Sequence, residues 1–285
     1  MKRLFALLGL VFLLSGCAPA QPDAQVAATT APVYEFTQRL CQGTGITVTQ
    51  LVTENISCLH DYTLSVRQVK AVEAAELVIL SGAGLEDFMA DLLTGKATVD
   101  SAHGVSLLGC EHDHDHEHIH DADPHIWLSP ENAMIMAENI CHALTAQYPQ
   151  QQEALEENLQ QLLLDLQALQ NYGSKQLQTL QFRELITFHD GFAYFAEAFG
   201  LEILKAVEEE SGSEASAGEL KALCDLVWTH QLPAIFTEVS GSASAARILS
   251  RETGVAIYTL DMAMSAGSYF DTMRRNIDAV KEALG

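Results

Sequence analysis

The chain contains few basic residues. Against 38 aspartates and glutamates stand 15 lysines and arginines, which gives a formal net charge of −23 at pH 7. Loss of Lys2 and Arg3 with a leader peptide would remove two positive charges and make this −25. Such a chain has no basic patch to neutralise phosphates, so nucleic acid is not an expected partner. Its acidity suits a protein that attracts cations.

Sequence motifs also argue against several metalloprotein classes. No CxxC pair occurs, so a zinc knuckle built from thiolates is not expected. HExxH occurs only at 116–120, inside a polar run of alternating histidines and not in a predicted helix, which argues against a zinc hydrolase whose general base lies beside a ligand on a helix. The six cysteines leave the disulfide pairing open, and five remain if the first carries lipid: Cys17, Cys41, Cys58, Cys110, Cys141 and Cys224.

The sequence of the N-terminus predicts an export signal. Residues 1–16 begin with a basic pair, and their apolar run over 4–14 is too short to span a bilayer. The following LSGC resembles the bacterial lipoprotein box, in which the cysteine, here Cys17, is acylated. An ordinary secretory peptide with an incidental cysteine is the alternative. Residues 17–32 are small, polar and proline-containing, which predicts a flexible tether.

Residues 33–149 alternate strand-like and helical patterns. Strands are expected at 46–53, 76–80 and 105–108. Ser65 with Gln68 forms a capping box before one helix, and the Ser-Pro pair at 129–130 begins another. This alternation predicts an N-terminal α/β lobe with a parallel sheet.

Residues 150–181 lack proline and carry leucines at helical spacing, which predicts one long amphipathic helix. Beyond it, residues 182–285 resume the alternation, with strands expected at 185–188, 234–239 and 255–260. We therefore predict a two-lobed α/β fold of mostly parallel sheets, joined by one long rigid helix.

A run of alternating histidines and acidic residues lies within the first lobe, at 111–120. Neutral imidazole is the commonest zinc ligand and carboxylates add oxygen donors, so the run predicts an auxiliary metal-binding loop. It cannot bury an apolar face and is expected in solvent. Its histidines are His112, His114, His116, His118 and His120.

Three other histidines lie where a strand or loop leads into a helix: His60, His125 and His189. Ligands of α/β proteins bind beyond the carboxyl ends of strands, so these three are candidate metal ligands. Cys58, two residues before His60, is an alternative thiolate ligand.

The chain here resembles the zinc-binding lipoproteins of bacterial ABC importers, a group that also contains manganese-binding and adhesin relatives. The resemblance covers about Pro32 to Gly285. It rests on the histidine-rich loop and on HDY at 60–62, DPHIWLSP at 123–130 and TFHDGFAYFAEAFGL at 187–201. It implies two lobes that hold metal between them, with the family's three histidines at His60, His125 and His189. Manganese-binding members have glutamate at the third position.

The resemblance also implies a carboxylate as fourth ligand. Asp261 is the best match, although the family's Asp-Pro-Leu-Gly here reads DMAM, and Ser129 replaces the usual aspartate before the proline. Glu238, at the end of another predicted strand, is a possible supporting or substitute ligand, and water is a third option.

These features together predict a Zn²⁺-capturing protein that is not an enzyme. Three imidazoles and one carboxylate suit tetrahedral zinc, whereas manganese prefers more oxygens. The resemblance implies delivery to an ABC permease and its ATPase by a monomer anchored outside the cytoplasmic membrane through Cys17. The alternatives are manganese or another divalent metal as cargo, a zinc-dependent hydrolase, or a surface adhesin.

Overall fold

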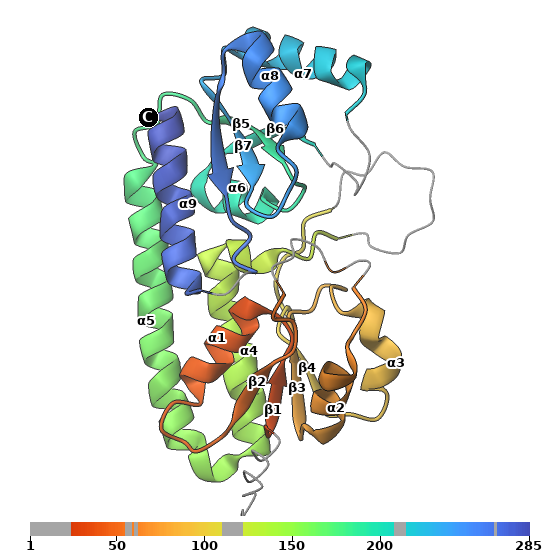
Figure 1. The fold of residues 1–285 in the computed structure, drawn as a ribbon. Helices are drawn as coiled ribbons and strands as arrows, with labels where there is room; N and C mark the ends of the chain where they lie inside the picture. The colour runs from red at the N-terminus through yellow and green to blue at the C-terminus, as the bar shows by residue number, and fades with distance from the viewer. Residues whose placement is uncertain (1–23, 55–58, 60–61, 110–121, 208–214, 265–266) are drawn as a thin grey trace, which may run out of the picture.

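The computed structural model describes residues 24–54, 59, 62–109, 122–207, 215–264 and 267–285. They form two α/β lobes, each built on a four-stranded sheet in which every pair of neighbouring strands is parallel (Figure 1). The predicted fold class is confirmed. No described helix is both long and apolar enough to cross a membrane.

The N-terminal sheet has the strand order β2-β1-β3-β4. Its strands are short: β1 (Val26–Ala28), β2 (Val48–Gln50), β3 (Leu77–Leu80) and β4 (Thr98–Asp100). The helices around it are α1 (Ala31–Leu40), α2 (Val66–Ala74), the 3₁₀ turn η1 (Asp87–Met89), α3 (Ala90–Leu93), the 3₁₀ turn η2 (Ile126–Leu128) and α4 (Pro130–Gln147).

The structure corrects the tether predicted for 17–32 over its described residues, 24–32. Val26, Ala27 and Ala28 are fully buried and form β1, a central strand of the sheet, and α1 begins at Ala31. A strand of three small residues has no periodicity that distinguishes it from a tether. Its burial comes from the strands on both sides, β2 and β3, which the local sequence does not specify.

Two further strand predictions need correction. Residues 105–108 are not in a strand, and the nearest strand is the edge strand β4, whose three residues include only one apolar side chain, Val99, which is too little to indicate a strand. The edge strand β6 (Glu202–Ala206) was not predicted either.

The predicted helix ends are confirmed where capping residues set them. Ser65 and Gln68 form the capping box of α2, and Ser129 accepts a hydrogen bond at the start of α4. The same local chemistry starts α7 (Ala217–His230), where Ser216 and Glu219 form a second capping box.

The helix α5 (Gln152–Gln176) runs along both lobes, after the short 3₁₀ turn η3 (Pro149–Gln151) (Figure 1). It is 25 residues long and buries Leu155, Leu162, Leu166 and Leu169 completely. Burial of each leucine stabilises the fold by about 1.5–3 kcal/mol. The ring of Phe199 packs so close to Gly173 that a Cβ there would lie 2.2 Å from it, so α5 needs a glycine at this contact.

The C-terminal sheet has the order β6-β5-β7-β8. Besides β6, its strands are β5 (Glu184–Phe188), β7 (Ala234–Glu238) and β8 (Ala256–Leu260). Its helices are α6 (Ala193–Phe199), α7, α8 (Ser244–Thr253) and α9 (Tyr269–Leu284), which lies beside α5 (Figure 1).

Candidate metal centre

The candidate ligand His125 comes from the loop that leads into η2. Only 4% of it is exposed, and Asp123 holds it in place. Oδ1 of Asp123 accepts a hydrogen bond from the backbone N–H of His125 (2.9 Å) and lies 2.7 Å from Nδ1 of its ring. A carboxylate beside Nδ1 favours the tautomer with its proton there, which directs the Nε2 lone pair away from Asp123.

His189 follows the last residue of β5 and brings a second imidazole to the first. The ring centroids of His125 and His189 lie 5.5 Å apart, and their planes are inclined at 79°. Two rings bonded to one tetrahedral zinc ion through nitrogens at ~2.0–2.1 Å have centroids about 5 Å apart. The two imidazoles therefore have a spacing at which one ion can bind both.

Gly191 leaves room for this pair. A Cβ at this position would lie 3.0 Å from Nδ1 of His125, 3.0 Å from Cδ2 of His189 and 2.5 Å from the methyl group of Met262. The absence of a side chain thus allows the two rings and the segment after β8 to meet.

Asp261 is the first residue beyond β8, and α9 fixes its backbone. Asn276 of α9, only 2% exposed, accepts from the Asp261 N–H (2.9 Å) and donates to the Asp261 carbonyl (2.7 Å). The carboxylate Oδ1 accepts from the N–H of Ala263 (2.8 Å), whose φ of +58° lies in the left-handed region. Asp261 is half-buried and its neighbour Met262 packs beside Gly191, so this segment borders the histidine pair.

Glu238 ends β7, and its side chain stabilises the following turn. It is 5% exposed, and Oε2 accepts from the N–H of Ser240 (2.9 Å). Its hydrogen bond to this turn gives Glu238 a structural role in the described part of the C-terminal lobe.

The remaining predicted site residues lie outside the described residues. They are His60, the loop histidines His112, His114, His116, His118 and His120, the alternative ligand Cys58 and the lipidation candidate Cys17. Within the described ranges, no three histidine, cysteine, aspartate or glutamate side chains gather closely enough to hold a metal ion. The structure thus brings together two of the predicted ligands, His125 and His189.

No cysteine of the described residues joins this pair of histidines in a metal-binding group. Among the described residues, Cys41, Cys141 and Cys224 are free thiols. Burial, followed by the nearby Cys141, raises the pKa of Cys41 to about 12, so this thiol stays protonated at neutral pH.

Hydrogen bonds between the lobes surround the two histidines. The Tyr194 hydroxyl of α6 donates to the carbonyl of Asp123 (2.9 Å) and accepts from the N–H of Leu108 (2.9 Å). The indole N–H of Trp127 donates to the carbonyl of Met262 (2.8 Å). Asp123, Gly191 and Trp127 lie within the histidine motifs of the sequence, but their roles depend on contacts between lobes that local patterns do not reveal.

The chain has two lobes with parallel sheets, which one helix spans, and a histidine from each lobe lies at their junction. These features define a two-lobed metal-binding solute-binding protein. Comparison with known families makes this specific. Residues 26–283 match the family described as ZnuA, zinc-uptake complex component A, periplasmic, and the chain belongs to this family. The family resemblance found in the sequence is confirmed.

Individual relatives agree with this assignment. The zinc-binding lipoprotein AdcA of Streptococcus pneumoniae is 30% identical over 98% of this chain, which spans 60% of the AdcA sequence. A crystal structure of ZnuA has a TM-score of 0.81 at 28% identity and covers 92% of this chain and 100% of its own. The Zn(II)-bound ZnuA-like domain of S. pneumoniae AdcA has a TM-score of 0.77 at 26% identity, covering 91% of this chain and 98% of its own.

Proposed function

We propose that this protein captures Zn²⁺ between its two lobes and delivers it to an ABC permease and its ATPase for zinc uptake. The observation that carries the proposal is the pair of imidazoles from opposite lobes, His125 and His189, 5.5 Å apart. In the proposal, His60 is the third nitrogen ligand and Asp261 supplies an oxygen. Glu238 or water is the alternative fourth ligand.

The donor set favours zinc over manganese. Imidazole nitrogens suit zinc in a tetrahedral site, whereas manganese prefers carboxylates, carbonyls and water. The relatives point the same way, because AdcA is described as zinc-binding and its ZnuA-like domain is described as Zn(II)-bound.

Ligands on both lobes explain how capture and delivery could be linked. Bound zinc bridges the lobes and favours the arrangement in which all its ligands are together. A permease that binds the arrangement with separated ligands better would lower the affinity and promote release. Affinity also falls as the pH drops through the range where imidazoles take up protons, because protons compete for the same nitrogens.

The remaining parts of the chain have supporting roles in this proposal. Lipidation of Cys17 would anchor the protein outside the cytoplasmic membrane, close to the permease. The loop at 111–120 would bind ions weakly and raise their concentration near the tight site. Loss of that loop is expected to reduce uptake only when zinc is scarce.

A chelator-competition titration tests the proposed zinc site. The mature protein without residues 111–120 is titrated with zinc and with manganese and compared with its His189→Ala variant. The exposed His142 on α4 provides the matched control, His142→Ala. The proposal requires one tight zinc site that is lost in His189→Ala and kept in His142→Ala, with much weaker manganese binding. Tight binding that disappears with the loop, or equal affinity for manganese, would contradict it.

A further inference from the structure

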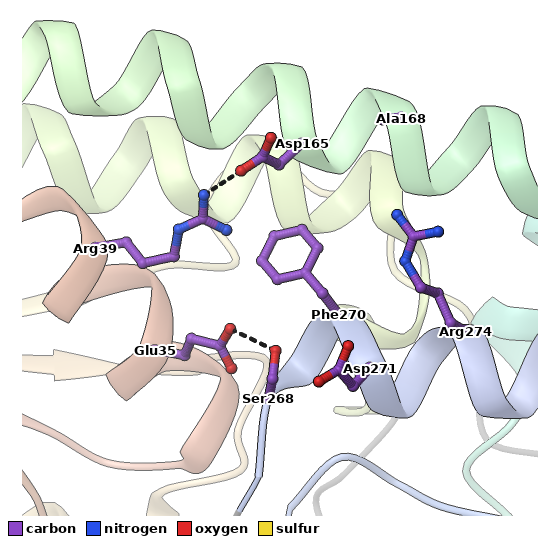
Figure 2. Close-up of a pocket in the computed structure, with 8 residues that line it drawn as sticks. All are labelled: Glu35, Arg39, Asp165, Ala168, Ser268, Phe270, Asp271 and Arg274. Carbon is purple, nitrogen blue, oxygen red and sulfur yellow. Dashed lines mark hydrogen bonds and ion pairs between the residues drawn. The ribbon is translucent and has the colours of Figure 1, made fainter.

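A pocket of about 480 Å³ lies between α1, α5 and α9 (Figure 2). Helix α1 packs on the N-terminal sheet, whereas α9 follows the last strand of the C-terminal sheet. The pocket therefore lies where three elements of both lobes meet. None of its lining residues is a candidate metal ligand.

In this pocket, Glu35 of α1 caps the N-terminus of α9. Its Oε2 accepts from the N–H of Tyr269 (2.6 Å), the first residue of α9, and its Oε1 accepts from the hydroxyl of Ser268 (3.1 Å). Ser268 is the N-cap residue, but its side chain makes no capping hydrogen bond to its own helix. A residue of one lobe thus satisfies a helix end of the other.

A second residue of α1 reinforces this contact. Arg39 pairs with Asp165 of α5, and its guanidinium lies 4.7 Å from the centroid of the Phe270 ring of α9 (Figure 2). Glu35 is half-buried, so its two hydrogen bonds are partly shielded from water.

Tyr269 connects this cap to the metal centre. Its fully buried ring packs edge-on against Phe36 of α1, with centroids 4.9 Å apart. Its hydroxyl donates to the carbonyl of Trp127 (2.7 Å), and the Trp127 indole donates to the carbonyl of Met262 (2.8 Å). Trp127 lies two residues after His125, and Met262 lies directly after Asp261.

We propose that Glu35 is a positioning residue for metal retention: by holding Tyr269, it fixes the His125 and Asp261 segments relative to one another. This inference rests on the proposed function, because it assigns Glu35 to the retention of the same ion. Without the cap, the start of α9 moves more freely, and the hydrogen bonds through Trp127 hold the two segments less firmly. Zinc then dissociates faster.

The test is a stopped-flow measurement of zinc release from the full protein into excess chelator. Glu35→Ala is expected to release zinc about tenfold faster, the effect of losing a favourable, partly buried charge at a helix N-terminus. Glu35→Gln keeps an acceptor for the Tyr269 N–H and should restore the rate to within about threefold of the wild type.

Asp271→Asn is the matched control, because Asp271 is an exposed acidic residue in the same first turn of α9. It removes a charge near the helix end and is expected to leave zinc release unchanged. Equal acceleration by Asp271→Asn and Glu35→Ala would overturn the proposal in favour of simple helix electrostatics. An unchanged rate in Glu35→Ala would overturn it as well.

Two further outcomes separate this inference from the proposed function. If Glu35→Ala does not fold, Ser268→Ala removes one of the two hydrogen bonds and should accelerate release about threefold, and no change would overturn the proposal. If the wild type itself binds no zinc tightly, the proposed function fails, and the inference fails with it.

Discussion

Replacement of Asp123 by alanine should weaken zinc binding without unfolding the protein. Oδ1 of Asp123 accepts from both the backbone and the ring of His125, at 2.9 and 2.7 Å, so the substitution removes both hydrogen bonds that orient this imidazole. Loss of a carboxylate behind a metal-binding histidine typically costs about 10–100-fold in metal affinity. This corresponds to about 1.4–2.8 kcal/mol of binding free energy.

The assay is a chelator competition at constant pH on the protein without residues 111–120. Asp123→Asn keeps one oxygen that can accept from His125, so its zinc dissociation constant should lie between those of the wild type and Asp123→Ala. Circular dichroism confirms that each variant is folded. Wild-type affinity in Asp123→Ala would refute the reasoning that this carboxylate prepares His125 for metal.

Two further predictions concern the packing of the site and a buried carboxyl in the first lobe. Gly191→Ala places a methyl group 3.0 Å from both imidazoles, so zinc titrations should show weaker binding, whereas Gly218→Ala, whose Cβ would meet nothing closer than 3.9 Å, should bind normally. Burial raises the pKa of Glu86 to about 7 from 4.5, although Thr29 and two backbone N–H groups donate to it. The folded state therefore favours the protonated form of Glu86, which adds roughly 3 kcal/mol to the free energy of unfolding. This added stability is complete below pH 4.5 and is lost as the pH rises through 7. Urea unfolding of the metal-free protein should show this decline, and Glu86→Gln should lack it. An equal decline in both proteins would contradict the assignment to Glu86.

The parts of the fold that the sequence predicts are those set by local chemistry. The leucines of α5 repeat at helical spacing, and the serine caps of α2 and α4 are satisfied within one helical turn. The strand β1 could not be predicted in this way. Its VAA sequence is buried only because β2 and β3 pair with it from later in the chain.

The same distinction holds for the candidate site. The sequence makes His125 and His189 candidate ligands because each lies where a strand or loop leads into a helix, and the structure brings their rings together. The structure adds contacts that no local pattern contains. Glu35 and Tyr269 are 234 residues apart in sequence, yet their hydrogen bond joins α1 to α9.

The most direct test of the central claim is a crystal structure of the zinc-loaded protein with data collected at the zinc absorption edge. The account predicts one strong anomalous peak between the lobes, ~2.0–2.1 Å from a nitrogen of His125 and a nitrogen of His189. A peak that lies elsewhere, bound to neither histidine, would contradict the account.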